Sequence, residues 1–268
     1  MKTEIKLITP AIAEEMLKMN TMNRMLLKDH LWEYARLMRN GLWKENSGEP
    51  IKIATDGTIL DGQYRLNALI LTKISLEFLI VSDLEKDIFT VLDSGKRRSS
   101  YDVLHIAGVS QAGKVSSMVI RYIKLHGGKV LSEDGTRYIS SSEILSMYNS
   151  RSKFWDAVVL MSESWYVKSQ HILSGADIGG VYAFLHGINE EDAFTFMDIL
   201  CTGVNLEFNN PIKLLRDKLI FSRINKKFSF TKAHKTALIF KAWNLFRNKK
   251  TIKILKYDSN VEDFPIPI

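Results

Sequence analysis

The segment Asp61–Arg65 (DGQYR) combines residue types and spacing that suit a phosphate-binding turn. Asp61 and Gly62 make a sharp turn after an apolar run, and a helix is expected to follow as far as Thr72. The start of a helix offers unpaired N–H groups and a positive dipole end to an anion. Because helical side chains lean towards the N-terminus, Arg65 can reach an anion at Gly62. An ordinary turn has the same local sequence, so the residues alone leave both interpretations open.

A second group of charged residues follows in the segment 92–104 (LDSGKRRSSYDVL). Lys96, Arg97 and Arg98 come directly before Ser99 and Ser100, either of which is a suitable N-cap for the next helix. Cations at the positive end of a helix oppose its dipole, and a bound phosphate or nucleic-acid backbone would offset that repulsion. The alternative is an exposed basic turn.

The strongest charge asymmetry lies near the C-terminus. Residues 213–256 carry fourteen Lys or Arg against one acid, Asp217, which is a net charge of +13, whereas residues 257–268 carry −3. Since the whole chain carries +7, residues 1–212 sum to −3. Acids that could balance these cations at i±4 are almost absent, which favours a polyanion partner over a solvated helical surface. The predicted DNA contacts are Lys213, Arg216, Arg223, Lys226, Lys227, Lys232, Lys235 and Lys241.

The elements that must position these residues fall into two parts. Periodicity and turn signals predict helices from Pro10 and over 28–41, a hairpin at Asp56-Gly57, a helix over 62–72 and a strand over 74–82. Beyond residue 104 the patterns are almost wholly helical, apart from a strand expected over 251–257. The predicted class is therefore α+β, with a small mixed α/β unit at 1–104 and a mainly helical, basic unit at 105–268.

Composition and cysteine count exclude several classes. The chain has 268 residues, of which 46% are hydrophobic and 25% charged, as in globular proteins that are not membrane-embedded. No apolar run is long enough to span a membrane, no secretion signal is evident, and the single cysteine, Cys201, excludes a disulfide framework. The six histidines lack metal-ligand spacing, so no metal site is predicted. We expect a cytoplasmic protein without a membrane partner.

The segment 108–117 (GVSQAGKVSS) matches the P-loop pattern only superficially. Val115 stands where Ser or Thr must hold the metal ion, and the residues before the segment favour a helix instead of the required strand. We therefore reject a P-loop here.

The segment 48–70 (GEPIKIATDGTILDGQYRLNALI), with the helix before it, resembles the ParB/sulfiredoxin superfamily, and most closely the ParB-like proteins carried by phages and prophages. Those proteins show a D-G-Q-H-R-type motif, a D-x-G-K-x-R-S-like segment and a K-A-W-N helix. The matching residues here are Asp61–Arg65, Asp93–Ser99 and Lys241–Asn244, and residues 20–24 (NTMNR) are similar to the N-terminal pattern of this branch.

The resemblance implies a nucleotide triphosphate, CTP or ATP, with Mg²⁺. The phosphate would be bound by Gly62, Gln63 and Arg65, and the segment Lys96–Ser99 (Lys96, Arg97, Arg98 and Ser99) would complete the pocket or contact DNA. Asp61, Gln63 and Asp93 are the implied catalytic residues. Gln63 stands where sulfiredoxins have their reactive cysteine and ParB clamps have a glutamate, so sulfinic-acid reduction is excluded and binding is favoured over turnover.

The predicted function is that of a phage- or prophage-type ParB-like protein that binds a nucleotide at the DGQYR corner and DNA through its C-terminal helices, with Mg²⁺-dependent NTP hydrolysis or phosphotransfer if it turns over. The alternative from another class is a non-catalytic DNA- or protein-binding factor. A ParB-like nuclease is a third alternative, which no clustered Asp, Glu and His residues support. A homodimer and a monomer are both open.

Overall fold

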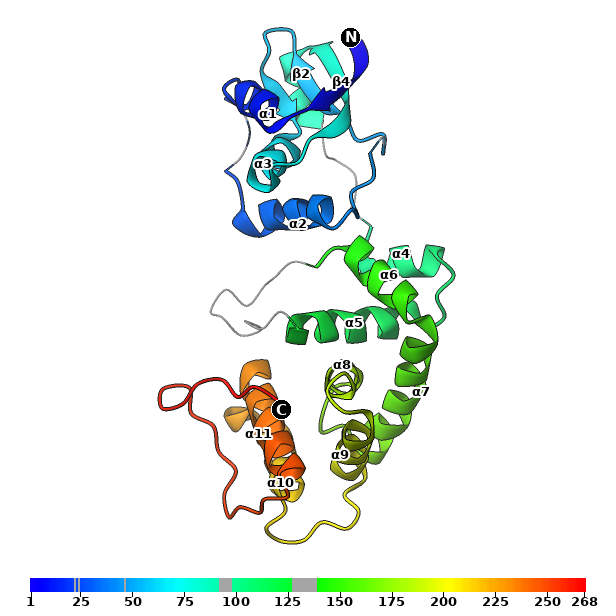
Figure 1. Ribbon diagram of the computed structural model, residues 1–268, viewed down its shortest axis with the longest axis vertical. Coiled ribbons are helices and arrows are strands. Elements are labelled where there is room, and N and C mark those ends of the chain that lie inside the picture. Colours follow the sequence, from blue (N-terminus) through cyan, green and yellow to red (C-terminus); the bar gives the residue numbers. More distant parts are fainter. Residues whose placement is uncertain (22, 24, 46, 92–97, 127–138) are drawn as a thin grey trace. The chain divides into compact units, whose positions relative to one another are not determined.

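The computed structural model describes residues 1–21, 23, 25–45, 47–91, 98–126 and 139–268. The chain divides into two compact units (Figure 1). Unit 1 comprises Met1–Ser99 with Thr136–Glu143, and unit 2 comprises Ser100–Gly135 with Ile144–Ile268. A mixed four-stranded sheet with helices precedes a mainly helical region, so the α+β class is confirmed.

The sheet of unit 1 contains both parallel and antiparallel neighbours. Its strands are β1 (Lys2–Ile8), β2 (Ile51–Ala54), β3 (Ile59–Asp61) and β4 (Leu76–Leu84), in the order β1-β4-β2-β3. The β1–β4 and β2–β3 pairs are antiparallel, and the β2–β4 pair is parallel. The predicted hairpin is confirmed, because Gly57 adopts a φ of 86° and its N–H donates to the carbonyl of Ala54 at 3.0 Å.

Among the described residues, the α-helices that belong wholly to unit 1 are α1 (Pro10–Leu17), α2 (Lys28–Arg39) and α3 (Gln63–Thr72). Thr9 caps α1 as predicted, since its side chain accepts a hydrogen bond from the N–H of Ile12 at 3.2 Å. In Figure 1, α3 lies between the sheet and α2. The buried side chains Leu66 and Leu69 of α3 share one core with Phe78 and Ile80 of β4. Helix α3 is therefore held in place by the sheet on one side and by α2 on the other.

Unit 2 is built around α8. Its helices are α4 (Ser100–Ile106), α5 (Ala112–His126), α7 (Ser152–Lys168), α8 (Gly175–His186), α9 (Glu190–Thr202), α10 (Pro211–Ile224) and α11 (Lys232–Arg247), with a short 3₁₀ turn, η2 (Lys226–Phe228). The division between the units falls within α6 (Ser141–Ser150), and a second 3₁₀ segment, η1 (Lys86–Val91), follows β4 in unit 1. Helix α8 packs against α5, α7 and α9, and α10 packs against α11.

A buried arginine connects three helices of unit 2. Arg121 of α5 forms an ion pair with Asp177 of α8 at 2.9 Å and donates a hydrogen bond to the hydroxyl of Thr236 in α11. Burial lowers the pKa of Arg121 below its ordinary value, although Asp177 opposes this effect. The contact needs a close approach of α5 and α8, which the small residues Gly179 and Gly180 allow.

Several local predictions are tested by the structure. Ser140 and Glu143 form the expected capping box, with each side chain accepting from the other residue's N–H, at 3.1 and 2.9 Å. The predicted strand at 251–257 is wrong, because this segment has no regular secondary structure. Lys114 of the rejected P-loop pattern lies within α5, after a helix, so that rejection is confirmed. In the described ranges, no helix is both long and apolar enough to cross a membrane.

Gly180→Ala should destabilise unit 2. A Cβ at this position would lie 2.5 Å from the Cβ of Arg121 and 3.0 Å from the backbone oxygen of Met118, so α5 and α8 would have to separate. We expect a loss of about 1–3 kcal/mol in the free energy of unfolding, measured by thermal unfolding of the helical signal. The matched control is Gly175→Ala in the same helix, where a Cβ meets nothing within 4 Å. Equal stability of the two variants would contradict the close packing.

Candidate functional site

The predicted phosphate corner is a sharp left-handed turn between β3 and α3. Gly62 is the N-cap of α3, with φ 112° and ψ 2°. A Cβ at Gly62 would also lie 3.0 Å from Cγ1 of Ile51 in β2, so backbone conformation and close packing both require glycine. Because Gly62 has no side chain, no side-chain cap occupies the first N–H groups of α3. Helix α3 begins directly after this glycine, as the sequence predicted.

Arg65 is committed to contacts within unit 1. One terminal nitrogen (Nη1) donates to the carbonyls of Glu49 and Pro50 at 2.6 and 3.0 Å, and the other (Nη2) donates to the carboxylate of Asp61 at 2.9 Å. The side chain is only 7% exposed. Arg65 thus joins the chain before β2, the end of β3 and the first turn of α3. A phosphate would have to share or replace Asp61, so the predicted phosphate contact stays a prediction.

The neighbouring residues of the motif connect α3 to the loop after α1. Gln63 is buried, and its side-chain oxygen accepts from Asn20 at 3.3 Å. Asn23 donates to Asn20 and to the carbonyl of Ile59, at 2.5 and 2.7 Å. The two asparagines of this loop therefore lie against the corner itself.

Tyr64 replaces the basic residue or histidine of the related motif, and its contacts are structural. Its hydroxyl accepts a hydrogen bond from the N–H of Leu27 at 3.1 Å. Its ring stacks on Tyr34 of α2, with centroids 6.0 Å apart. Tyr64 therefore holds α2 and the segment before it against α3.

The predicted catalytic acids receive no support as a cluster. Asp61 is paired with Arg65 and lies 3.8 Å from the ammonium of Lys52. Within the parts of the chain that the structure describes, no three His, Cys, Asp or Glu side chains gather to hold a metal ion. Asp93, Lys96 and Arg97 lie outside the described residues, whereas Arg98 and Ser99 are described and exposed.

The only cysteine of the sequence, Cys201, has a buried and unreactive thiol. Cys201 is buried in α9, and burial raises the pKa of its thiol to about 12. A thiol with so high a pKa stays protonated at neutral pH and is a poor nucleophile. Cys201 is therefore a poor candidate for a reactive thiol.

Three of the eight predicted DNA contacts are engaged inside unit 2. Lys213 pairs with Asp217 at 2.7 Å, and Lys241 pairs with Glu262 at 2.6 Å. Arg216 donates to the carbonyls of Leu200 and Cys201 at 2.5 and 2.9 Å, and so it caps the end of α9. These cations have structural partners, and charge counting along the sequence could not distinguish them from free ones.

The other predicted DNA contacts differ in accessibility. Arg223, Lys227 and Lys232 are exposed, Lys235 is half-buried, and the side chain of Lys226 is outside the described residues. Four further cations that the prediction omitted are exposed after α11: Lys249, Lys250, Lys253 and Lys256. The seven exposed cations have no ion-pair partner in the described part of the chain.

The K-A-W-N segment of α11 binds the C-terminal tail. The side chain of Asn244 donates to the carbonyl of Ile266 and accepts from the N–H of Ile268, at 2.8 and 3.0 Å. Trp243 and Arg247 both donate to the carbonyl of Ile268, at 2.8 and 2.7 Å. In this chain the motif therefore contacts its own backbone.

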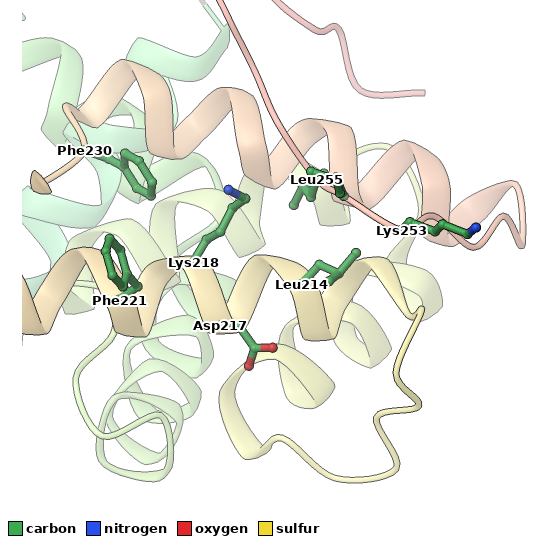
Figure 2. Close-up of a pocket in the computed structure, with 8 residues that line it drawn as sticks. Leu214, Asp217, Lys218, Phe221, Phe230, Lys253 and Leu255 are labelled. Atoms are coloured by element: carbon green, nitrogen blue, oxygen red, sulfur yellow. The ribbon is translucent and has the colours of Figure 1, made fainter.

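An apolar pocket beside α10 was missed in the sequence. It has a volume of about 490 Å³ and lies between α10 and the segment after α11 (Figure 2). Its lining residues are Leu214, Asp217, Lys218, Phe221, Phe230, Lys253, Ile254 and Leu255. The signal was present in the segment 220–230 (IFSRINKKFSF), where phenylalanines alternate with cations. The sequence-based prediction used charge alone, so it named lysines and arginines and left out the phenylalanines between them.

Comparisons of the chain with protein-family models, with curated proteins and with solved structures found no significant match. The likeness to the ParB/sulfiredoxin superfamily therefore rests on the short motifs and stays a prediction.

Arg65→Ala should destabilise unit 1 by about 3 kcal/mol, because it removes three partly buried hydrogen bonds and leaves Asp61 without its nearest cation. The matched control is Lys52→Gln, which removes a longer, more exposed ion pair and should cost less than about 1 kcal/mol. Chemical denaturation followed by circular dichroism measures both. Similar stability of the Arg65 variant and the wild type would show that these bonds contribute little.

Proposed function

We propose that the protein binds DNA through the exposed cations of α10, of α11 and of the segments that follow each helix. The observation that supports this function is the set of seven exposed Lys and Arg that lack an ion-pair partner in the described residues. A DNA duplex carries one negative charge for about every 1.7 Å of its axis, so it can use many such cations at once.

The internal pairs make the remaining charge more significant. The ion pairs of Lys213, Lys241 and Arg247 already use three acids that lie beside the basic helices, namely Asp217, Glu262 and Asp192. The exposed cations therefore repel one another with little local compensation, and a polyanion would relieve this repulsion by displacing condensed counterions.

The double variant Lys227→Gln with Lys232→Gln should weaken DNA binding and lower its dependence on salt. If each lysine contacts one phosphate, the slope of log affinity against log salt should fall in magnitude by about 2. Fluorescence anisotropy with a labelled DNA duplex over a range of salt concentrations measures affinity and slope together.

The matched control is Lys153→Gln with Lys168→Gln. These lysines are exposed on α7 of the same unit, so the two double variants have the same net charge. Equal losses in the two double variants would reduce the effect to overall charge. A wild-type affinity that does not change with salt would exclude DNA as the partner.

A nucleotide phosphate at the corner of unit 1 is our second proposal, together with a ParB/sulfiredoxin-like assignment of that unit. Support comes from the left-handed Gly62 at the start of α3 and from the DGQYR motif. We propose binding without turnover, because Asp61 is held by Arg65 and a glutamine occupies position 63.

The variant Asp61→Asn tests the corner more sharply than removal of Arg65. Asp61 occupies the guanidinium that a phosphate would use, so its neutralisation should leave nucleotide affinity unchanged or higher. If Asp61 instead holds Mg²⁺, the same change should weaken binding that depends on Mg²⁺. Isothermal titration with CTP, ATP and GTP, with and without Mg²⁺, distinguishes the two roles. No heat with any nucleotide from folded protein would leave the corner a structural turn.

A further inference from the structure

The pocket beside α10 combines accessible aromatic rings with positive charge, which are the two properties of a site for unpaired nucleotides. Figure 2 shows Phe221 and Phe230 at one end, Lys218 in the middle, and Leu214 and Leu255 at the other end. Its volume of about 490 Å³ is in the range, about 300–1,000 Å³, of pockets that accept small organic groups.

The aromatic side chains beside this pocket are unusually accessible. Phe221 is 51% exposed and Phe228 is 65% exposed, and their ring centroids are 6.1 Å apart. Ile224, between them in sequence, is 73% exposed. Large apolar side chains that are grouped and exposed commonly mark a binding surface. The fold of unit 2 does not use these faces for its own core.

Phe230, which lines the pocket, forms a second aromatic pair with His234. Its ring stacks on the imidazole of His234, with centroids 4.6 Å apart and an angle of 19°. Burial and the nearby charge of Lys218 lower the pKa of His234 below its ordinary value, so at neutral pH this ring is uncharged and suited to stacking. Tyr257 lies edge-on to His234 at 5.7 Å.

Cations accompany the aromatic rings. Lys218 and Lys253 line the pocket, and the exposed Arg223 and Lys227 flank the phenylalanines in sequence. Asp217 is the only carboxylate among the lining residues, and Lys213 pairs with it at 2.7 Å. A fitting ligand has regular negative charge and flat apolar faces.

We propose that this surface binds a single-stranded polynucleotide, with bases on Phe221 and Phe228 and phosphates on Lys218 and Lys253. An unpaired strand offers both base faces and phosphates, whereas a duplex hides its base faces inside the helical stack. A membrane surface also combines negative charge with apolar groups, but a flat bilayer fits poorly against a pocket lined from two sides. This inference rests on the proposed nucleic-acid binding and names the strand state that is preferred.

The test compares a labelled oligothymidylate, which does not pair with itself, with a labelled hairpin duplex in fluorescence anisotropy. The double variant Phe221→Leu with Phe228→Leu keeps apolar volume and removes both aromatic faces. Since stacking contributes about 1–3 kcal/mol per base, the Kd for the single strand should rise by at least about tenfold. The Kd for the duplex should change by less than about twofold, because the phosphate contacts remain.

The matched control is Phe208→Leu. Phe208 is 81% exposed in unit 2 and does not line the pocket, so its substitution should leave both affinities unchanged. Circular dichroism verifies that every variant is folded.

The outcomes separate the two proposals. An unchanged single-strand Kd in the double variant, or equal losses for strand and duplex, would overturn the stacking site while DNA binding stands. If the protein binds neither the single strand nor the duplex, both proposals are overturned. Sedimentation with vesicles that contain phosphatidylserine tests the membrane. Vesicle binding that is lost in the double variant, with unchanged single-strand affinity, would assign the surface to lipid.

Discussion

A guanidinium withdrawn from water needs acceptors or a counter-charge, and in both units arginines find these partners on neighbouring segments. Arg65 collects two carbonyls and the Asp61 carboxylate at the corner of unit 1. In unit 2, Arg121 joins three helices, and Arg216 closes the end of α9. Each arginine therefore connects separate elements of its own unit. The same demand for acceptors explains why positions that look suited to ligands are already occupied from within.

Local signals predicted the elements well where side chain and backbone interact over a few residues. The Thr9 cap, the Asp56-Gly57 hairpin and the Ser140–Glu143 box are of this kind, and the structure confirms them. Strand β1 was missed because its alternating charges resemble a polar surface, and it exists through its pairing with β4. The segment 251–257 shows the reverse case, since its alternation finds no partner strand in the part of unit 2 that the structure describes.

The candidate sites were harder to predict than the fold because function depends on what each charge already contacts. The i, i+4 spacing of Asp61 and Arg65 is compatible with their mutual ion pair, but the same two residues also fit a phosphate-binding motif, and the local sequence does not distinguish these roles. For Arg216, the carbonyl partners come from another helix, and nothing in the local sequence announces them. The aromatic residues near α10 were visible in the sequence, but their exposure follows only from the packing of unit 2.

The docked tail also affects the electrostatics of α11 without belonging to any proposed ligand contact. Hydrogen bonding to Lys241 lowers the pKa of Glu262 below its ordinary value, so this carboxylate is charged at neutral pH beside the ammonium of Lys241. Asn244 holds the end of the tail by its backbone, so this attachment does not depend on the side chains of Ile266 and Ile268. Replacement of Glu262 alone would therefore change the effective charge of α11, while every residue of the helix stays the same.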